Sequence, residues 1–263
     1  MRQLSERPGR STAVAHPESG ITLSASAGAD PVLHPELLKV LESAAQLQRV
    51  VPDAVLVGET VSKTYAGHRL SHDHDHVLTH LQSRYEAVLE AVEATDGWAT
   101  SVRASKPPMT VMGTRGGVQA GLRQLRRSVP LETRMLRLPS GHQVQIPTAD
   151  EALRVKAYLV VQRNQVRDYL DVAAMSDRLG LDAAAGVLSD IDSFYVDRSG
   201  LHESVVSELV VRLAKPHPND SAVLTGLSRY KGLAKRWQDW NEVVDVCGEL
   251  AQIIIADGTG GHV

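Results

Sequence analysis

The 263-residue chain is poor in aromatic side chains and contains one cysteine, Cys247. Aromatic residues make up 4% of the sequence, so a hydrophobic core has to be built mainly from Val, Leu, Ile and Ala. One cysteine excludes an intramolecular disulfide framework and any zinc site that needs several thiolates. It also fits a reducing compartment.

The chain also lacks long apolar runs and an excess of charge of one sign. No stretch of 18 apolar residues occurs, so no transmembrane helix is expected, and the first 20 residues lack the apolar segment of a secretory signal. Lys and Arg total 28 against 31 acidic residues, a formal charge of −3. This balance argues against coating nucleic acid by bulk charge, although it permits a local basic groove. We expect a soluble, cytoplasmic protein.

The sequence changes character twice, which predicts three regions. Residues 1–31 are rich in Ser, Gly, Pro and Ala without periodicity and are interpreted as a flexible N-terminal tail. Residues 32–147 mix short apolar runs, glycine turns and amphipathic segments, which indicates an α/β domain. Residues 148–257 indicate a helical C-terminal domain. The expected fold class is therefore α/β (α+β), a mixed sheet with flanking helices followed by a helical half.

Hydrophobic periodicity and turn residues predict the individual elements. Helices are expected at 34–50, 59–66 and 81–94, and then at 149–163, 166–179, 182–196, 201–213, 220–235 and 239–256. Strands are expected at 54–57, 71–78, 102–111, 118–125, 131–138 and 142–146, with turns at 113–117 and at Gly141.

The segment 71–78, Ser-His-Asp-His-Asp-His-Val-Leu, alternates strictly over its first six positions. On a strand, Asp73 and Asp75 share one face with Ser71, and the three histidines share the other. Two such carboxylates can hold divalent cations such as Mg²⁺, which keep open positions for phosphate. Just upstream, a short strand ends at Gly58 and a helix begins, where backbone N–H groups can cradle phosphates. The combination indicates phosphoryl or nucleotidyl transfer.

The histidines leave a second interpretation open. Five of the eleven lie between His68 and His80, and a His-Asp doublet with further histidines can bind two metals in a His/Asp metal phosphohydrolase. Such doublets usually lie on a helix, whereas the strict alternation here favours a strand. His72, His74 and His76 would then face the opposite layer or solvent.

Two segments resemble a known family. VGETVSKTYAGHRLSHDHDHVL, residues 57–78, resembles the opening motif of the nucleotidyltransferase superfamily, which includes DNA polymerase beta. More narrowly, it resembles the AbiEii/AbiGii-type toxin nucleotidyltransferases, which typically read Gly-Gly-Thr-Ala, then Gly-His-Arg, then Ser-x-Asp-x-Asp. TADEALRVKAYLVVQRNQVRDYLDVAAM, residues 148–175, resembles their second signature, a helix with a lysine followed by Arg-Asp-x-x-Asp. The resemblance covers residues 54–80 and 148–176 closely.

The resemblance implies a nucleotidyltransferase-like sheet and a helical half that contributes to the active-site cleft. It implies an enzyme that uses Mg²⁺ or Mn²⁺ to transfer a nucleotidyl group from a nucleoside triphosphate to a hydroxyl acceptor, on RNA (typically tRNA) or on protein. The implied partner is the cognate antitoxin protein of a type IV toxin–antitoxin pair. No association with a membrane is implied.

The resemblance also assigns roles to residues of this sequence. Asp73 and Asp75 would hold the metal and act in catalysis. Lys156 would neutralise the triphosphate as a compact point charge, with Asp168 or Asp171 orienting it or assisting the acceptor. The residues expected to line the bound nucleotide are Gly58, Glu59, Thr60, Ser71 and Arg163.

A nearly continuous helix over 150–175 would support this assignment. Lys156, Arg163, Arg167 and Asp171 would then lie within one stripe about 80° wide on an otherwise apolar helix. Such a stripe is not expected to be fully solvated. The alternative is a structural ladder in which Arg167 pairs with Asp171, four residues later.

Two departures from the family pattern keep another hypothesis open. Glu59 stands at the family's second glycine and would place negative charge beside the triphosphate, unless its side chain points away. Gln119 stands where the superfamily has a third carboxylate on a later strand, and Glu132 is the nearest replacement. The second hypothesis is therefore a catalytically degenerate nucleotide- or protein-binding module on the same fold.

A run of arginines and two tryptophans have alternative interpretations. The arginines form either an RNA-facing patch or triphosphate clamp, or exposed strand edges without a partner, and they are Arg115, Arg123, Arg126, Arg127, Arg134 and Arg137. Trp237 and Trp240 are expected to pack between helices rather than to stack on bases, because no aromatic ladder accompanies them.

Overall fold

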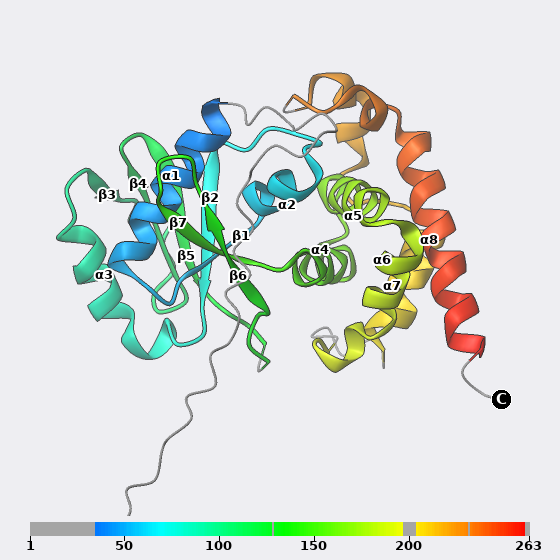
Figure 1. The fold of residues 1–263 in the computed structure, drawn as a ribbon, viewed down its shortest axis with the longest axis horizontal. Helices are drawn as coiled ribbons and strands as arrows, with labels where there is room; N and C mark the ends of the chain where they lie inside the picture. The colour runs from blue at the N-terminus through cyan, green and yellow to red at the C-terminus, as the bar shows by residue number, and fades with distance from the viewer. Residues whose placement is uncertain (1–34, 128, 197–203, 231, 261–263) are drawn as a thin grey trace, which may run out of the picture.

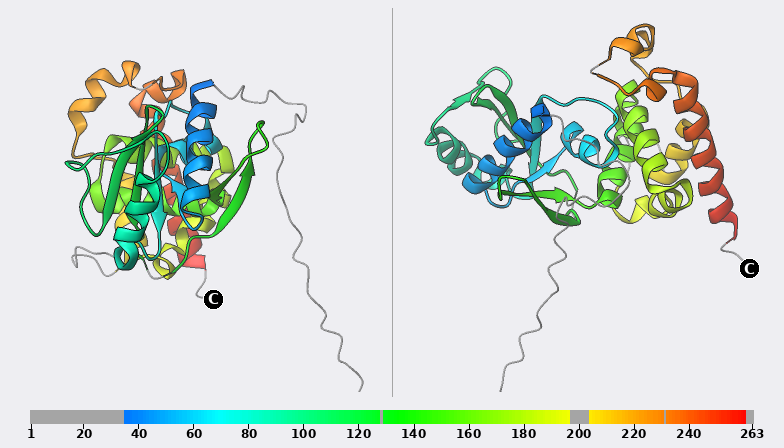
Figure 2. Two further views of the ribbon diagram at one scale, coloured as in Figure 1. Left: turned by 90° about the vertical axis from the view of Figure 1, so that its left-hand side faces the viewer. Right: turned by 45° about the horizontal axis from the view of Figure 1, so that its top comes forward.

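A computed structural model describes residues 35–127, 129–196, 204–230 and 232–260 of the chain. An α/β half and a helical half lie side by side, with α2 (Glu59–Ala66) between the sheet and the helices α4 (Ala149–Arg163) and α5 (Val166–Leu179) (Figure 1). The two halves stay adjacent when the molecule is turned (Figure 2). This arrangement confirms the expected fold class. The predicted tail, 1–31, lies outside the described residues.

The sheet has five strands in the order β1-β2-β5-β4-β3. Its central strands β2 (Asp73–Leu78) and β5 (Val118–Gln124) run parallel, and all other neighbours are antiparallel. The remaining strands are β1 (Val55–Val57), β4 (Thr110–Arg115) and β3 (Trp98–Thr100). A separate hairpin consists of β6 (Thr133–Arg137) and β7 (Gln143–Pro147).

Helices cover one face of this sheet. α1 (Pro35–Val50) and α3 (Tyr85–Glu93), which follows the short 3₁₀ turn η1 (Gln82–Arg84), pack on apolar side chains of β2, β4 and β5. The core on this face includes Leu47, Leu78, Val88, Val111 and Leu122. Period-2 alternation turns every second residue of β2 toward these helices, so the residues between them lie on the opposite face, where the site is built.

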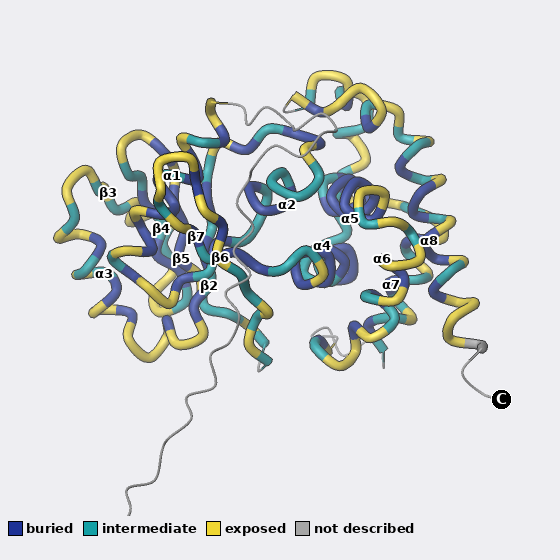
Figure 3. The backbone as a smooth tube through the Cα atoms, in the orientation of Figure 1, coloured by how far each residue is buried: buried dark blue, intermediate teal, exposed yellow. Residues whose placement is uncertain are grey.

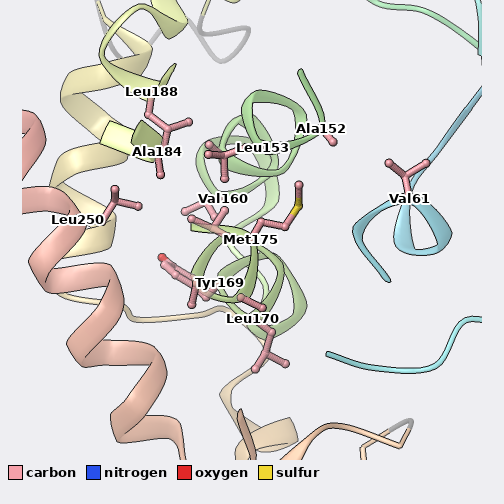
Figure 4. Close-up of a cluster of buried hydrophobic side chains, with 14 of the residues drawn as sticks. Val61, Ala152, Leu153, Val160, Tyr169, Leu170, Met175, Ala184, Leu188 and Leu250 are labelled. Carbon is pink, nitrogen blue, oxygen red and sulfur yellow. The ribbon is translucent and has the colours of Figure 1, made fainter. Parts of the chain in front are cut away.

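The helical half packs around α4 and α5. The remaining elements are α6 (Leu181–Ser189), η2 (Ile191–Ser193), α7 (Val205–Ala214), η3 (Ser221–Arg229), η4 (Lys235–Gln238) and α8 (Trp240–Gly260). Leu153 of α4, Tyr169 of α5, Leu188 of α6 and Leu250 of α8 meet in one cluster (Figure 4). Most residues of α4 and α5 are buried, whereas α8 has both buried and exposed residues (Figure 3).

Several expected elements have different limits in the structure. The helices expected at 149–163 and 166–179 are confirmed as α4 and α5, so the nearly continuous helix over 150–175 that would carry a charged stripe does not form, because Asn164 adopts a left-handed conformation (φ 51°) between them. The strand expected at 102–111 starts at residue 110, since Pro107 and Pro108 have no N–H to donate to a ladder. The turn expected at 113–117 is confined to Gly116 and Gly117, both with positive φ, because β4 stays paired with β5 as far as residue 115.

The second half also departs in detail. The helix expected at 220–235 consists of the 3₁₀ segment η3, interrupted at Gly226, and the separate turn η4. The helix expected at 182–196 ends at Ser189, and the one expected at 201–213 is described from Val205 onward, its first residues lying outside the described ranges. Of the helices that the structure describes, none is both long and apolar enough to cross a bilayer. Cys247 is buried in this half, and burial raises the pKa of its thiol to about 12.

Two histidines of β2 face the covered side of the sheet. His74 and His76 are buried, with Nδ1 atoms 3.4 Å apart, and Nε2 of His74 lies 3.0 Å from the hydroxyl of Ser43 on α1. Burial, reinforced by the charge of Arg115, lowers the pKa of His74 to about 4. Burial also holds the pKa of His76 well below its ordinary value. Burial therefore favours the neutral form of both rings.

This preference for the neutral form predicts a pH-dependent stability. The unfolded chain protonates these histidines near pH 6.5, whereas the folded chain keeps His74 neutral down to about pH 4. These histidines leave the unfolding free energy unchanged above pH 6.5. They lower it as the pH drops toward 4, by about 2 kcal/mol at pH 5 from His74 alone. Urea unfolding at pH 7.5 and pH 5.0 measures this difference. His74→Asn should reduce it, whereas the same change at the exposed His80 should leave it unaltered.

Gly113 of β4 provides a test of the strand packing. A Cβ there would lie 2.5 Å from Cζ2 of Trp98 and 2.8 Å from the carbonyl oxygen of Ala99. We expect Gly113→Ala to lower the unfolding free energy by about 1–3 kcal/mol through overpacking. The control is Gly186→Ala on α6, where no atom lies within 4 Å; it should raise stability by about 0.5–1 kcal/mol. Equal urea midpoints for the two variants would contradict the strand packing described.

Candidate functional site

Asp73 and Asp75 lie on the face of β2 opposite the buried histidines. The parallel register with β5 places Asp73 beside Gln119 and Asp75 beside Gly121. Both aspartates are partly exposed, whereas the alternate residues of β2 are buried. The predicted pair is thus assembled on one open face of the sheet.

Two glycines make room for the Asp75 carboxylate. A Cβ on Gly121 would lie 2.3 Å from Oδ1 of Asp75, so any larger residue at 121 would displace the carboxylate. Gly58, with φ 83°, lies on the other side, where a Cβ would be 4.0 Å from Oδ2. Gly58 was expected at this site from the sequence and Gly121 was not, although Gly121 lies two positions after Gln119 and so shares its face.

Arg123 also lies on this face, and from the sequence it was expected only as one of six arginines that form a patch, a triphosphate clamp or exposed strand edges. Its Nε donates to Oδ1 of Asp75 at 3.2 Å, and the two side chains are 45% and 33% exposed. The sequence signal was present, because Arg123 follows Gln119 and Gly121 at the same period of two. It was obscured by the five other arginines between residues 115 and 137.

The hydroxyls predicted to line phosphates brace the start of β2. The Thr60 hydroxyl, on α2, donates to the backbone carbonyl of Asp73 at 2.7 Å and lies 2.9 Å from the Ser71 hydroxyl. Ser71 in turn lies 3.4 Å from Oδ1 of Asp73. Thr60 and Ser71 are buried, so these contacts fix α2 against β2 beside the carboxylates.

Glu59, the first departure from the family pattern, is engaged by a cation. Its carboxylate lies 2.5 Å from the guanidinium of Arg69. The negative charge at the start of α2 is therefore offset within the protein, which reduces the repulsion expected between Glu59 and a triphosphate.

Arg69 belongs to a buried charge cluster around Asp171. The Asp171 carboxylate accepts two hydrogen bonds from Arg69, both of 2.9 Å, and lies 2.8 Å from Nζ of Lys156 and 2.7 Å from Nε2 of His68. We call these four residues the Asp171 cluster. Arg69 and Lys156 hold the pKa of Asp171 well below its ordinary value despite its burial, while burial lowers the pKa of His68. The cluster joins the loop after α2 to α4 and α5.

This cluster replaces the single charged stripe expected on one continuous helix. Because the helix breaks at Asn164, Lys156 and Asp171 lie on separate helices and pair with each other across them. The alternative expectation, an ion pair between Arg167 and Asp171, does not account for the position of this carboxylate. The recorded partners of Asp171 come from α4 and from the loop after α2. Lys156 also borders a cavity of about 10 Å³ together with Gly58 and Ser62.

Asp168 and Arg163 form a second pair. Arg163, at the end of α4, donates to the buried Asp168 carboxylate from Nε at 2.8 and 3.0 Å and from Nη2 at 2.5 Å. The pair lies on the two sides of the break at Asn164. The contacts recorded for it are with each other rather than with β2, so the assigned roles of both residues in nucleotide binding stay predictions.

The histidine orientation excludes the His/Asp phosphohydrolase hypothesis. His74 and His76 point into the covered core, away from Asp73 and Asp75. His72 is 61% exposed and lies 3.4 Å from Glu36 of α1. Among the described residues of β2 no shared His/Asp ligand set forms, because adjacent residues of a strand point to opposite faces of the sheet.

Asp73 and Asp75 supply oxygen donors of the type that hard divalent cations take. Two carboxylates on an open face, with phosphate oxygens to complete the shell, are how Mg²⁺ is commonly bound. The third position holds the neutral Gln119, and within the described ranges no three His, Cys, Asp or Glu residues group as a metal site. Glu132 is the acid expected to replace the third carboxylate that is missing at Gln119. It accepts a 2.9 Å hydrogen bond from Arg154 of α4 and is therefore already paired.

The arginines between 115 and 137 do not form one patch. The Arg127 side chain is 4% exposed, lies 2.8 Å from Glu151 and stacks over the ring of Tyr195, whereas Arg123 joins Asp75 and Arg137 is exposed on the hairpin. The interpretation of the tryptophans as packing residues is confirmed for Trp237, which is buried in the helical core.

Comparison with known proteins finds partial sequence relatives. No protein-family model matches the chain. It is 34% identical over 193 residues to the heme uptake protein MmpL11 of Mycobacterium tuberculosis, which covers 69% of this chain and 19% of the relative. It is 34% identical over 131 residues to the mycolic acid-containing lipids exporter MmpL11 of Mycolicibacterium smegmatis, covering 50% and 13%. The chain thus spans about a fifth or less of these relatives.

Solved structures with a similar arrangement are more distant in sequence. JHP933 from Helicobacter pylori is 18% identical, with a TM-score of 0.46, and the match covers 87% of this chain and 96% of that one. An antigenic nucleotidyltransferase-like protein from Paracoccidioides brasiliensis is 17% identical, with a TM-score of 0.40 and coverages of 72% and 96%. Likenesses of this size are too distant to assign an activity.

Proposed function

We propose that the chain is a metal-dependent nucleotidyltransferase that transfers a nucleotidyl group from a nucleoside triphosphate to a hydroxyl acceptor. The observation that carries the proposal is the Asp73–Asp75 pair, held on an open sheet face beside the glycine turn that begins α2. The motif resemblance over 57–78 and 148–175 supports the same chemistry.

Asp73 and Asp75 would hold Mg²⁺ or Mn²⁺. A divalent cation held there would supply positive charge to offset the negative charge that develops on the leaving pyrophosphate. The start of α2 would bind the phosphates through backbone N–H groups, because the first N–H groups of a helix have no intrahelical partner and Gly58 provides no side-chain cap.

The proposed reaction is a displacement at the α-phosphorus. The acceptor hydroxyl oxygen forms a new bond to that phosphorus, the bond to the oxygen bridging to the β-phosphate breaks, and pyrophosphate leaves. The acceptor proton passes to water at the half-exposed carboxylate face. The neutral Gln119 is a poor base for this proton, so catalysis would rest on positioning and charge.

Within this proposal, the Asp171 cluster positions the nucleotide site. The side chains of Lys156 and Arg69 are 5% and 1% exposed and share one carboxylate. We therefore assign Lys156 a positioning role at the start of α2 rather than direct contact with phosphate. Glu59, paired with Arg69, extends the same network to the first turn of α2.

Several finer features belong to the proposal. The acceptor hydroxyl would belong to RNA, typically tRNA, or to a protein. The chain would be an AbiEii-type toxin with a cognate antitoxin as its partner, and it would act in the cytoplasm. The alternative, a degenerate nucleotide- or protein-binding module, is favoured by one observation, Gln119 beside Asp73.

Transfer of label tests the proposal against this alternative. The protein is incubated with Mn²⁺ or Mg²⁺, each α-labelled nucleoside triphosphate and total RNA, and label is followed in RNA and in the protein. We expect transfer by the native chain and a loss of about 100-fold or more in Asp73→Asn and Asp75→Asn, because the metal ligands are removed. Asp96→Asn, at an exposed turn, is the control. Nucleotide binding without transfer would support the binding module.

The Asp171 cluster gives a separate prediction on stability. Asp171→Asn leaves two buried cations without their shared carboxylate, so we expect the unfolding free energy to fall by about 3–5 kcal/mol. Asp177→Asn removes a carboxylate of the same helix that is 41% exposed and pairs with Arg236, and it should change stability by less than about 1 kcal/mol. Urea unfolding at pH 7.5 compares the two, and a similar small loss in both would contradict a stabilising cluster.

A further inference from the structure

The carboxylate face carries a positive side chain in contact with its own acids. Across the parallel pair, Asp73 faces Gln119, Asp75 faces Gly121, and Val77 faces Arg123. Because Gly121 has no side chain, Arg123 reaches back across it and its Nε meets Oδ1 of Asp75 at 3.2 Å. Gln119 and Arg123 thus present an amide and a guanidinium on β5. In the nucleotidyltransferase superfamily that the sequence resembles, a later strand has a third carboxylate at the place of Gln119.

Arg123 differs from the other cations near the site in its access to solvent. Its side chain is 45% exposed, whereas those of Arg69 and Lys156 are 1% and 5% exposed and engaged by Asp171. A guanidinium has five N–H donors, and the contact with Asp75 uses the one on Nε. The planar fork suits bidentate binding of phosphate oxygens.

We propose that Arg123 binds the phosphates of the nucleotide and supplies the second positive charge of the site, which takes a single divalent cation held by Asp73 and Asp75. This inference rests on the proposed nucleotidyltransferase function. It accounts for Gln119, because a third carboxylate is needed to hold a second cation and is not needed beside a guanidinium. It also accounts for Gly121, whose missing side chain lets Arg123 and Asp75 meet.

The variant Arg123→Gln should change the affinity of the protein for a metal ion and its affinity for a nucleotide in opposite directions. Without nucleotide, Arg123 competes with a cation for the Asp75 carboxylate, so Arg123→Gln should bind Mn²⁺ about two- to fivefold more tightly. With nucleotide, the variant loses a charge-assisted contact, so its affinity for a non-hydrolysable nucleoside triphosphate should fall about tenfold or more. A purely structural arginine would weaken both or neither.

Paramagnetic resonance titration of free Mn²⁺ and calorimetric titration of the nucleotide analogue measure the two affinities. We expect one Mn²⁺ per native chain, loss of that site in Asp73→Asn, and partial recovery of nucleotide affinity in Arg123→Lys. Arg137→Gln, an exposed strand arginine on the hairpin, is the control and should match the native chain in both titrations. Thermal unfolding of each variant confirms that it is folded.

A second variant tests the charge replacement directly. Gln119→Asp combined with Arg123→Gln restores a third carboxylate and removes the guanidinium, so the number of bound Mn²⁺ should rise from one to two in the presence of the nucleotide analogue. Two Mn²⁺ in the native chain, or unchanged nucleotide affinity in Arg123→Gln, would overturn the role of Arg123 alone. Absence of any Mn²⁺ binding that depends on Asp73 would overturn the proposed function as well.

Discussion

The arrangement of the site depends on the ion pairs and hydrogen bonds made by the buried Asp171 carboxylate. This carboxylate lies on α5, in the helical half, and is shared by Lys156 of α4 and by His68 and Arg69 from the loop after α2. Burying one carboxylate with two cations is favourable only when geometry and hydrogen bonds are nearly complete, so the cluster holds the two halves in one relative position. Through Arg69 and Glu59 that constraint extends to the helix start beside Asp75.

The two faces of β2 carry different kinds of side chain. One face places His74 and His76 in the core as neutral rings, and the other places Asp73 and Asp75 at a surface. The alternation is a backbone property, so it separates a face that needs uncharged groups from one that carries two charges. The same geometry keeps His74 and His76 away from Asp73 and Asp75 and leaves the two aspartates as oxygen donors for the proposed hard cation.

Much of the fold could be predicted from residue patterns, and the failures have local causes. α1, α2, β2 and β5 were expected close to their observed limits because periodicity and glycine turns agree there. The boundary between the helices at 149–163 and 166–179 was predictable, whereas the nearly continuous helix over 150–175 needed for a charged stripe is wrong. A left-handed asparagine, whose side chain bonds to the carbonyl of His217, decides that point through a contact far along the chain.

The sequence alone determined that two aspartates share a strand face after a glycine turn, since spacing and the pleat are local properties. Only the tertiary structure decided which charges those aspartates meet. Arg123 approaches Asp75 because β5 pairs in parallel with β2 in one register, and Lys156 is engaged by Asp171 because two helices pack against each other. Register and helix packing depend on contacts between segments distant in sequence, and spacing along the chain cannot specify them.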